Sequence, residues 1–404
     1  MNKEFLNKRY KKEKRFILLG RVAVSLTIIF LVILLGSILL RGISGFYTTN
    51  IFLTTNLSQE IIDPEDKKNV EEIYKSSWRK VAKNSIYDVL SEFNKSKNID
   101  KSSRKDKRDF LKLFSRSSEF YIRDFTLENL DSIGKEVKIS IPSSSLVDQF
   151  LKGKINIAVN EDDRPINDKQ ISWINFMVEN KMIERKFNIN FFYKGDSRNA
   201  EEAGILGAIV GSFFVILVAI IVAFPVGVMS AIYLEEFAPK NKITNIIEVN
   251  INNLAAVPSI VFGLLGLAIF LNFFGLPRSS PLAGGLVLAL MTLPTIIISS
   301  RVAIKSVPPS IREAAMGIGA SKMQSVFHHV IPLAVPGILT GTIIGMARAL
   351  GETAPLLMMG MVAFIVDVPQ SITDPSTVLP AQIFLWSDQP ERGFEEKTAA
   401  ATII

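Results

Sequence analysis

The sequence predicts an all-α, polytopic membrane protein that carries one soluble α+β insert. Three observations support this fold class. The chain has 404 residues, of which 48% are hydrophobic, and its mean hydropathy is +0.28. Its charges are unevenly spread, because residues 41–203 hold 54 of the 85 charged side chains. Long uncharged apolar runs fill most of the remainder, which indicates membrane spans around an aqueous insert rather than a soluble enzyme.

Five apolar runs are long enough to cross a membrane, since a helix needs about 20 apolar residues to span the hydrocarbon core. The first, 22–40, exceeds a typical secretory signal and no small-residue cleavage site follows it, so we expect a retained anchor. The other predicted spans are about 203–234, 250–275, 279–300 and 334–366. An incomplete last span is predicted to start at about 398.

The basic N-terminus, residues 1–21, predicts the orientation. It holds eight Lys or Arg and two Glu beside the first apolar run, and therefore supplies most of the net charge of +7. Basic residues next to a span favour the cytoplasm and contact with lipid, whereas nucleic acid is not needed to explain them. We expect a multi-pass protein of the cytoplasmic membrane, with the insert 41–202 outside and the loop of about 301–332 inside.

The insert 41–202 is predicted to be a small α+β domain. Residues 60–120 are highly charged and read as helical, and the segment 101–108 is too polar for a core. Residues 135–160 alternate apolar and polar side chains around Ile139 and Ile157, which favours short strands. Two roles stay open, a solvated spacer or a docking surface for an external partner.

Several classes of site are excluded or disfavoured. The chain has no cysteine and only two histidines, so disulfides, thiol chemistry and a metal site are not expected. His328 and His329 are adjacent and point to different faces of a helix. The phosphate-binding pattern G-x-x-x-x-G-K-[ST] does not occur. We therefore expect no catalytic residue and no cofactor in this chain, and any ATPase must be another polypeptide.

The loop after the fourth span carries a helix signal. Ser310 and Glu313 have the spacing of a capping box, and two prolines precede them. A short helix is predicted from about Ile311 to Ile318, ending near Gly319.

The same loop resembles a known family. Glu313-Ala314-Ala315, followed three residues later by Gly319, resembles the EAA loop of ABC importer permeases. His329 and Ile331 depart from the family pattern before Pro332. In that family the loop is the coupling helix that contacts the cytoplasmic ATPase. The resemblance therefore implies a coupling role for Ser310, Arg312, Glu313, Ala314, Ala315 and Gly319.

Longer stretches resemble one branch of these proteins, the PstA family of phosphate ABC importer permeases. They are Tyr233–Pro239, Asn252–Gly263, Thr292–Thr295, Ala349–Leu356 and Leu379–Asp388. The resemblance implies the type I ABC importer permease fold, which has six helices, and inorganic phosphate as cargo. It also implies the homologous permease PstC, two copies of the ATPase PstB and the periplasmic phosphate-binding protein PstS as partners, with ATP and Mg²⁺ held by the ATPase.

Arg348 and Glu352 stand out within the late spans, because ionisable groups deep in a membrane are costly and usually functional. Their i, i+4 spacing predicts one helix face. A guanidinium suits a tetrahedral oxyanion through its forked donors. We expect both to line a substrate pathway, with Thr353, Asn252, Asn253 and Thr295 as polar neighbours. A purely structural ion pair is the alternative.

Two further features concern helix packing. Gly337, Gly341 and Gly345 recur every fourth residue and predict close helix contact. Pro258 and Pro294 predict kinks or breaks within spans. At the level of function two rivals stay open, the same architecture for another oxyanion or small solute, and a membrane-anchored sensor with an external ligand-binding domain.

Overall fold

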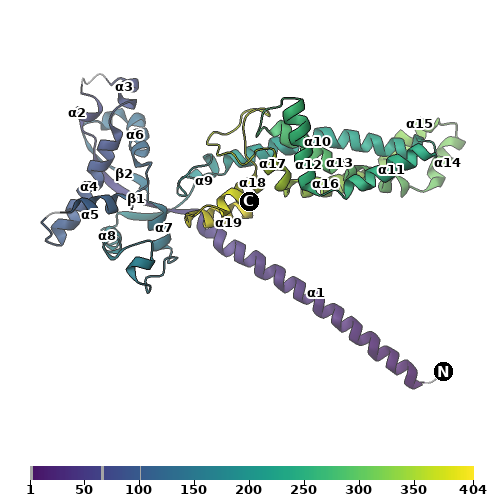
Figure 1. Ribbon diagram of the computed structural model, residues 1–404, viewed down its shortest axis with the longest axis horizontal. Helices are drawn as coiled ribbons and strands as arrows, with labels where there is room; N and C mark the ends of the chain where they lie inside the picture. Colours follow the sequence, from purple (N-terminus) through teal and green to yellow (C-terminus); the bar gives the residue numbers. More distant parts are fainter. Residues whose placement is uncertain (1–2, 65–67, 101) are drawn as a thin grey trace. The chain divides into compact units, whose positions relative to one another are not determined.

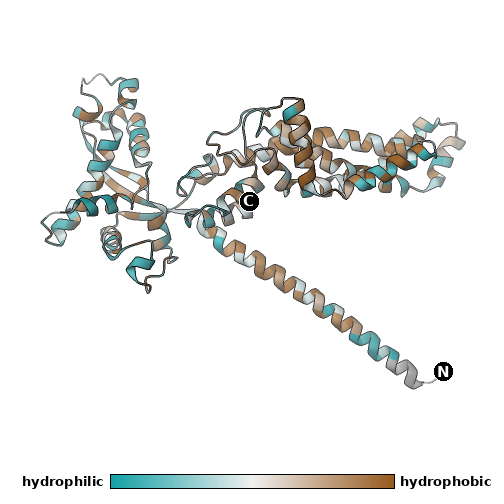
Figure 2. Ribbon diagram, in the orientation of Figure 1, coloured by the Kyte–Doolittle hydropathy of each residue, from teal (hydrophilic) through white to brown (hydrophobic). Residues whose placement is uncertain are grey.

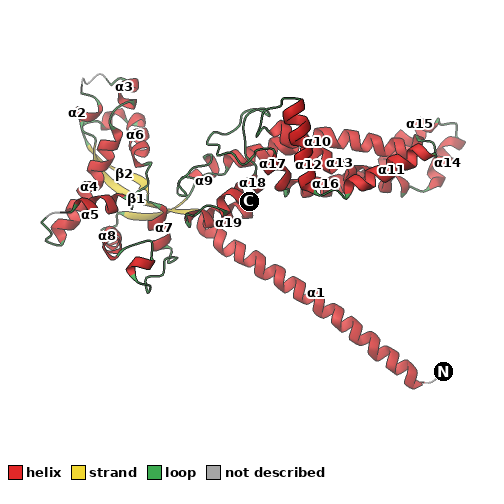
Figure 3. Ribbon diagram, viewed as in Figure 1, coloured by secondary structure: helices red, strands yellow, loops and turns green. Residues whose placement is uncertain are grey.

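The computed structural model describes residues 3–64, 68–100 and 102–404. The chain forms two compact units, one of Met1–Asn188, Asn199–Glu201 and Pro390–Ile404 and one of Ile189–Arg198 and Glu202–Gln389 (Figure 1). The predicted fold class is confirmed, because helices dominate and the described strands form one small sheet in the first unit (Figure 3). Of the expected N-terminal and polar segments, residues 1–2 and 101 lie outside the described residues.

The first helix is longer than its apolar run. Helix α1 spans Lys3–Gly45, because the basic residues that precede the predicted span are good helix formers and continue it. Apolar residues surround the helix from about Val22 to Leu40, and its side chains there are largely exposed (Figure 2). Residues Arg9–Gly45 meet the length and hydropathy of a membrane span.

The sheet of the first unit is antiparallel, with β1 (Tyr47–Asn56) between β2 (Glu136–Pro142) and β3 (Ile183–Phe187). Leu53 pairs with Ile139, and both side chains are buried because alternate residues of a strand face the core. The helices predicted for residues 60–120 are present, and α4, α6 and α7 pack against the strands. The helices of the insert are α2 (Gln59–Ile62), α3 (Val70–Tyr74), α4 (Trp78–Ser96), α5 (Arg104–Leu111), α6 (Ser118–Glu128), α7 (Ser145–Leu151) and α8 (Asp168–Glu179).

The strand expected around Ile155–Val159 is wrong. Gly153, with φ of +70°, ends α7, and the next residues form turns in which Ile155 alone is buried. The alternation of apolar and polar residues in this segment does not reveal whether a neighbouring strand is available to pair with it. Both edges of β1 are already taken, since β3 occupies the side that β2 leaves open.

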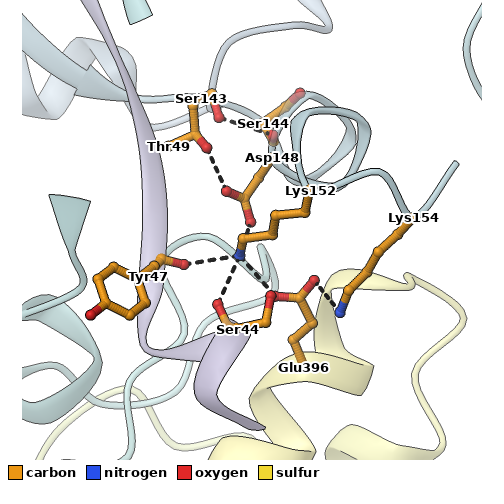
Figure 4. A network of polar contacts seen from close by, with 9 residues as sticks. All are labelled: Ser44, Tyr47, Thr49, Ser143, Ser144, Asp148, Lys152, Lys154 and Glu396. Atoms are coloured by element: carbon orange, nitrogen blue, oxygen red, sulfur yellow. Dashed lines mark hydrogen bonds and ion pairs between the residues drawn. The ribbon is translucent and has the colours of Figure 1, made fainter. Parts of the chain in front are cut away.

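A buried charge cluster joins four elements of the first unit (Figure 4). Lys152 Nζ lies 2.6 Å from Asp148 Oδ2 and 2.8 Å from Glu396 Oε2, and it donates to the carbonyls of Ser44 and Tyr47 at 3.0 Å. Glu396 belongs to α19 (Gly393–Ile403), and its other oxygen pairs with Lys154 at 2.6 Å. The cluster, Asp148, Lys152, Lys154 and Glu396, fixes α19 and the end of α1 against α7 and β1.

The second unit holds the remaining candidate spans. They are Leu206–Phe237, which is α10 (Leu206–Ile232) with a π-helical turn, α13 (Pro281–Lys305), and Lys322–Leu350, which joins α15 (Lys322–Ser325) through the π-helical turn Val326–Val330 to α16 (Ile331–Leu350). A fifth is a bent pair, α11 (Lys242–Ala255) and Ser259–Phe273, whose parts meet at 102°. The shorter helices are α9 (Asn190–Tyr193), α12 (Ser259–Gly266), α14 (Pro309–Gly317), α17 (Ala354–Met358) and α18 (Leu379–Ser387).

Prolines explain where these helices differ from the expected runs. Pro258 lacks an N–H and restricts Val257, so the expected run 250–275 breaks there. The expected span 334–366 is not one helix, because α16 ends at Leu350 and Pro355 begins the short α17. Pro294, by contrast, lies inside α13, which continues without a break.

Helix α13 packs along both α10 and α16. Glycines allow these close approaches, since a Cβ at Gly285 would lie 2.6 Å from Val218 Cβ and one at Gly341 would overlap the side chain of Ser299. Gly337 and Gly341 therefore allow the close packing of α16 on α13 that the repeat predicts, whereas Gly345 makes only an ordinary contact.

We expect Gly341→Ala to lower the free energy of unfolding by about 1–3 kcal/mol, because overpacking a close helix contact forces the backbones apart. Gly345→Ala is the matched control on the same helix, since its Cβ would lie 3.6 Å from Thr295 Cγ2, an ordinary contact. Thermal unfolding of the purified chain measures both. Equal stability of the two variants would contradict the packing assigned to α13 and α16.

Lys152→Met should destabilise the first unit strongly, by about 3–5 kcal/mol, because it leaves a buried carboxylate short of a partner. The Lys152 and Glu396 side chains are each only 5% exposed. Lys169→Met is the control, because its pair with Asp106 is exposed.

Burial raises the pKa of Glu396, but Lys152 and Lys154 outweigh that effect and hold the pKa below 4.5. The stabilisation by Glu396 should therefore be complete above pH 4.5 and be lost as the pH falls through the lowered pKa. Thermal unfolding across this pH range tests it.

Candidate functional site

The predicted loop helix is present as α14, with different boundaries. It spans Pro309–Gly317, and Pro308 rather than a side-chain cap stands at its start. The capping box expected at Ser310 and Glu313 is wrong, because the paired prolines start the helix two residues earlier and place Ser310 inside it. Gly319 ends the helix with φ of +95°. The N–H of Ala320 then reaches the carbonyl of Ala315 at 3.1 Å, so glycine fits the role expected there.

The residues of α14 face two ways. Glu313 and Ala314 are exposed, whereas Ala315 is buried against the bundle. Exposed apolar side chains follow, and Ile318 is 84% exposed. The outer surface of the loop therefore offers a carboxylate beside apolar side chains, an arrangement that suits a protein partner.

Arg312 faces the bundle instead. Its guanidinium donates to Glu236 Oε1 at 2.6 and 2.9 Å, to the Val307 carbonyl at 2.7 Å and to the Ile304 carbonyl at 3.0 Å. It thus joins α14 to Ile304 in the last turn of α13, to Val307 just after that helix, and to the π-helical turn Tyr233–Phe237 at the end of α10. The geometry makes Arg312 an anchor of the loop within the chain.

A second ion-pair group lies on the same side of this unit. Arg301 contacts Glu248 at 2.9 Å and Glu235 at 3.4 Å, which links α13, α11 and the turn after α10. Sequence reasoning missed Glu235, Glu236, Glu248 and Arg301 as functional residues. The available signal was the acidic pair that directly follows an apolar span and faces a basic loop.

Arg348 lies on the exposed side of α16. Its side chain is 62% exposed. Thr340 and Ile344, which precede it at steps of four residues on the same helix face, are exposed as well, and together they form the exposed row of α16. Its Nε lies 3.6 Å from Glu352 Oε1, an ion pair longer than a hydrogen bond. The expectation of one shared helix face is wrong, because α16 ends at Leu350 and Glu352 reaches back from the following loop.

The other expected pathway residues divide into two groups. Thr353 follows Glu352 at the start of α17, and Thr295 of α13 packs opposite Gly345, one turn before Arg348. Asn252 and Asn253 are exposed on α11, which packs on α13. The structure therefore places Thr353 beside Glu352 and Thr295 against Gly345 on the buried side of α16, and it leaves the asparagines on a separate helix.

Metal-ligating side chains do not gather in this unit. Within the part of the chain that the structure describes, no group of three or more His, Asp or Glu residues is placed to hold a metal ion. His328 and His329 are exposed on the π-helical turn before α16.

Comparison with known proteins agrees with this geometry. Residues 223–386 match the family described as binding-protein-dependent transport system inner membrane component. A phosphate transport system permease protein PstA of Yersinia pestis is 33% identical over 232 residues, which cover 57% of this chain and 77% of that protein. The chain belongs to the family of binding-protein-dependent inner membrane components. It is accordingly a multi-pass, non-catalytic permease of the inner membrane.

Further similarities cover smaller shares of this chain. The probable ABC transporter permease protein YqgI of Bacillus subtilis is 34% identical over 172 residues, 43% of this chain and 58% of that protein. The chain thus spans little more than half of the YqgI relative. Residues 3–161 match a domain of unknown function, DUF3333. A solved amino acid ABC transporter is 20% identical with a TM-score of 0.36, covering 48% of this chain and 83% of that one.

We predict that Glu236→Gln loosens α14, because Arg312 loses its charged partner in a half-buried site. The loss of about 1–2 kcal/mol expected for a partly exposed charged hydrogen bond corresponds to roughly tenfold faster amide exchange. Hydrogen exchange over residues 309–317 measures it. Glu313→Gln, an exposed carboxylate of the same helix, is the control and should leave the exchange unchanged. Equal exchange in both variants would show that the Glu236 contact does not hold the loop.

Proposed function

We propose that this permease is one membrane subunit of an ATP-driven importer that moves inorganic phosphate across the cytoplasmic membrane by alternating access. The observation that carries the proposal is the exposed Arg348 on α16. A charged side chain in a span is costly against lipid and is normally turned to a partner or an aqueous pathway. The similarity to a phosphate transport system permease protein PstA supports phosphate as the cargo.

The chemistry of the site suits that cargo. Arg348 offers forked N–H donors to a tetrahedral oxyanion. Glu352 would hold the guanidinium loosely between transport events, because its carboxylate lies 3.6 Å from Arg348 Nε, close enough for an ion pair but too far for a hydrogen bond. A bound phosphate would compete with this carboxylate for Arg348, and the competition would keep phosphate from being trapped. Thr295 and Thr353 add hydroxyl groups near the end of the same helix.

The partners follow from the same proposal. The exposed row of α16 would face the homologous permease PstC, and phosphate would arrive from the periplasmic binding protein PstS. Two copies of the ATPase PstB would contact the exposed side of α14 through Glu313 and Ala314, and they would bind ATP and Mg²⁺, so this chain would hold no cofactor. The N-terminus would then lie in the cytoplasm and the α+β insert outside. Arg312 would pass force from α14 to α13 and α10.

Arg348→Ala should reduce phosphate uptake at least tenfold, because a hydrogen bond to a charged group contributes about 1.5–3 kcal/mol. The measurement is uptake by the reconstituted complex, with assembly and basal ATP hydrolysis checked. Arg278→Ala, which removes an exposed cation from the loop before α13, is the control and should transport normally.

Three outcomes bear on the proposal and its rivals. Normal uptake by Arg348→Ala would sink the pathway role. ATP hydrolysis stimulated by another oxyanion but not by phosphate would reassign the cargo. Intact uptake after Glu313→Lys would remove the coupling role of the loop and favour a membrane-anchored sensor.

A further inference from the structure

A groove in the α+β insert runs between α4 and α6. The groove consists of two adjoining cavities of about 630 and 520 Å³, and Arg79, Lys83 and Glu119 line both of them. Each volume lies within the range of small-molecule sites. The groove belongs wholly to the insert and involves none of the residues placed on the transport path.

Positive charge gathers in this groove. Five cations line it against the single carboxylate of Glu119, and they are Arg79, Lys80, Lys83, Arg116 and Arg123. Residues 41–203 as a whole are nearly neutral, with 28 basic and 26 acidic side chains. The local excess therefore does not reflect the composition of the domain, and it makes the groove attractive to anions.

Four of these cations form no ion pair within the described residues, although the Glu119 carboxylate lines the same groove. Among the residues that the structure describes, Arg79, Lys80, Lys83 and Arg116 form no ion pair and no side-chain hydrogen bond. Cations elsewhere in the insert do pair, as in Lys68–Asp131, Lys112–Asp109 and Lys169–Asp106. Arg79 and Lys80 also lie in the first turn of α4, where the helix dipole disfavours positive charge. This arrangement lowers stability and would be relieved by a bound anion.

The fifth cation is held in a fixed position. The Arg123 guanidinium lies 4.4 Å from the ring centre of Tyr74 and 5.1 Å from that of Phe120, and it pairs with Asp124 at 2.8 Å. Tyr74 and Phe120 are themselves 53% and 48% exposed. Stacking on aromatic rings orients a guanidinium while its edge remains able to donate. The groove thus combines an oriented cation, four cations that form no ion pair, and apolar ring surface.

We propose that the groove between α4 and α6 binds a phosphate-bearing anion, either free inorganic phosphate or the phosphate of a lipid headgroup. Cations come from both walls, Arg79 and Lys83 on the α4 side and Arg116 and Arg123 on the α6 side. A tetrahedral phosphate group directs its oxygens several ways and can accept from both walls at once, whereas a single planar carboxylate presents two oxygens to one side.

The test is equilibrium dialysis of the full chain in a maltoside detergent, carried out in an Arg348→Ala background. That background removes the proposed pathway contact, so the outcome does not depend on the proposed transport function. The probes are radiolabelled inorganic phosphate and glycerophosphoglycerol, a soluble lipid headgroup. Arg79→Gln with Lys83→Gln should weaken binding at least about tenfold, because two charged donors are lost. Arg104→Gln with Lys105→Gln removes two exposed cations from α5 and should leave binding unchanged.

The outcomes separate the two sources of phosphate. Groove-dependent binding of inorganic phosphate supports the free anion, and groove-dependent binding of the headgroup alone supports a lipid. Three results would overturn the proposal: neither probe binds, both double variants bind equally well, or malonate displaces the probe as effectively as phosphate does. Arg116→Gln, from the opposite wall, serves as a second variant should the Arg79 and Lys83 pair impair folding, and it must weaken binding as well.

Discussion

A guanidinium is poorly tolerated against hydrocarbon, and this constraint organises the membrane unit. The price of a central arginine is several kcal/mol even where snorkelling relieves it. Arg348 nevertheless lies on the open side of α16, with only one loosely held carboxylate beside it. The exposed row of α16 is therefore the face that must be covered by protein or water, and the buried row, with Gly341 and Gly345, is the face that packs within the chain.

Helix α13 links this face to the loop on which a partner would act. It packs against α10 and α16 through glycine contacts, and the carbonyls of Ile304 in its last turn and of Val307 just after it accept from Arg312 of the loop helix α14. Glu236 and Arg301 add ion pairs to the turn after α10 and to α11. A displacement of α14 is thus resisted by several helices at once, which is the property that a coupling element needs. The π-helical turns Tyr233–Phe237 and Val326–Val330 flank this region, and such turns often occur at functional sites.

Most of the fold was predictable from the sequence, because hydrophobic length alone sets the spans. What the sequence could not provide was the fate of each proline. Pro258 breaks its helix, whereas Pro294 lies in a continuous one, and the difference depends on tertiary packing rather than on the residue itself. The false strand at Ile157 has a similar origin, since alternation does not reveal whether a sheet edge is free. At the site, Arg348 was found because charge is rare in spans. The contact of Arg312 with Glu236 could not be foreseen, because the two residues are 76 positions apart in the chain.

The most direct measurement of the central claim uses the absence of native cysteine. Arg348→Cys in the assembled transporter would carry the only thiol of this chain, which can be treated with a membrane-impermeant, charged thiosulfonate reagent. If Arg348 lines an aqueous pathway, the thiol should react with this reagent, and phosphate should slow the reaction. A thiol that reacts only with lipid-soluble reagents, or whose reaction is indifferent to phosphate, would contradict the account.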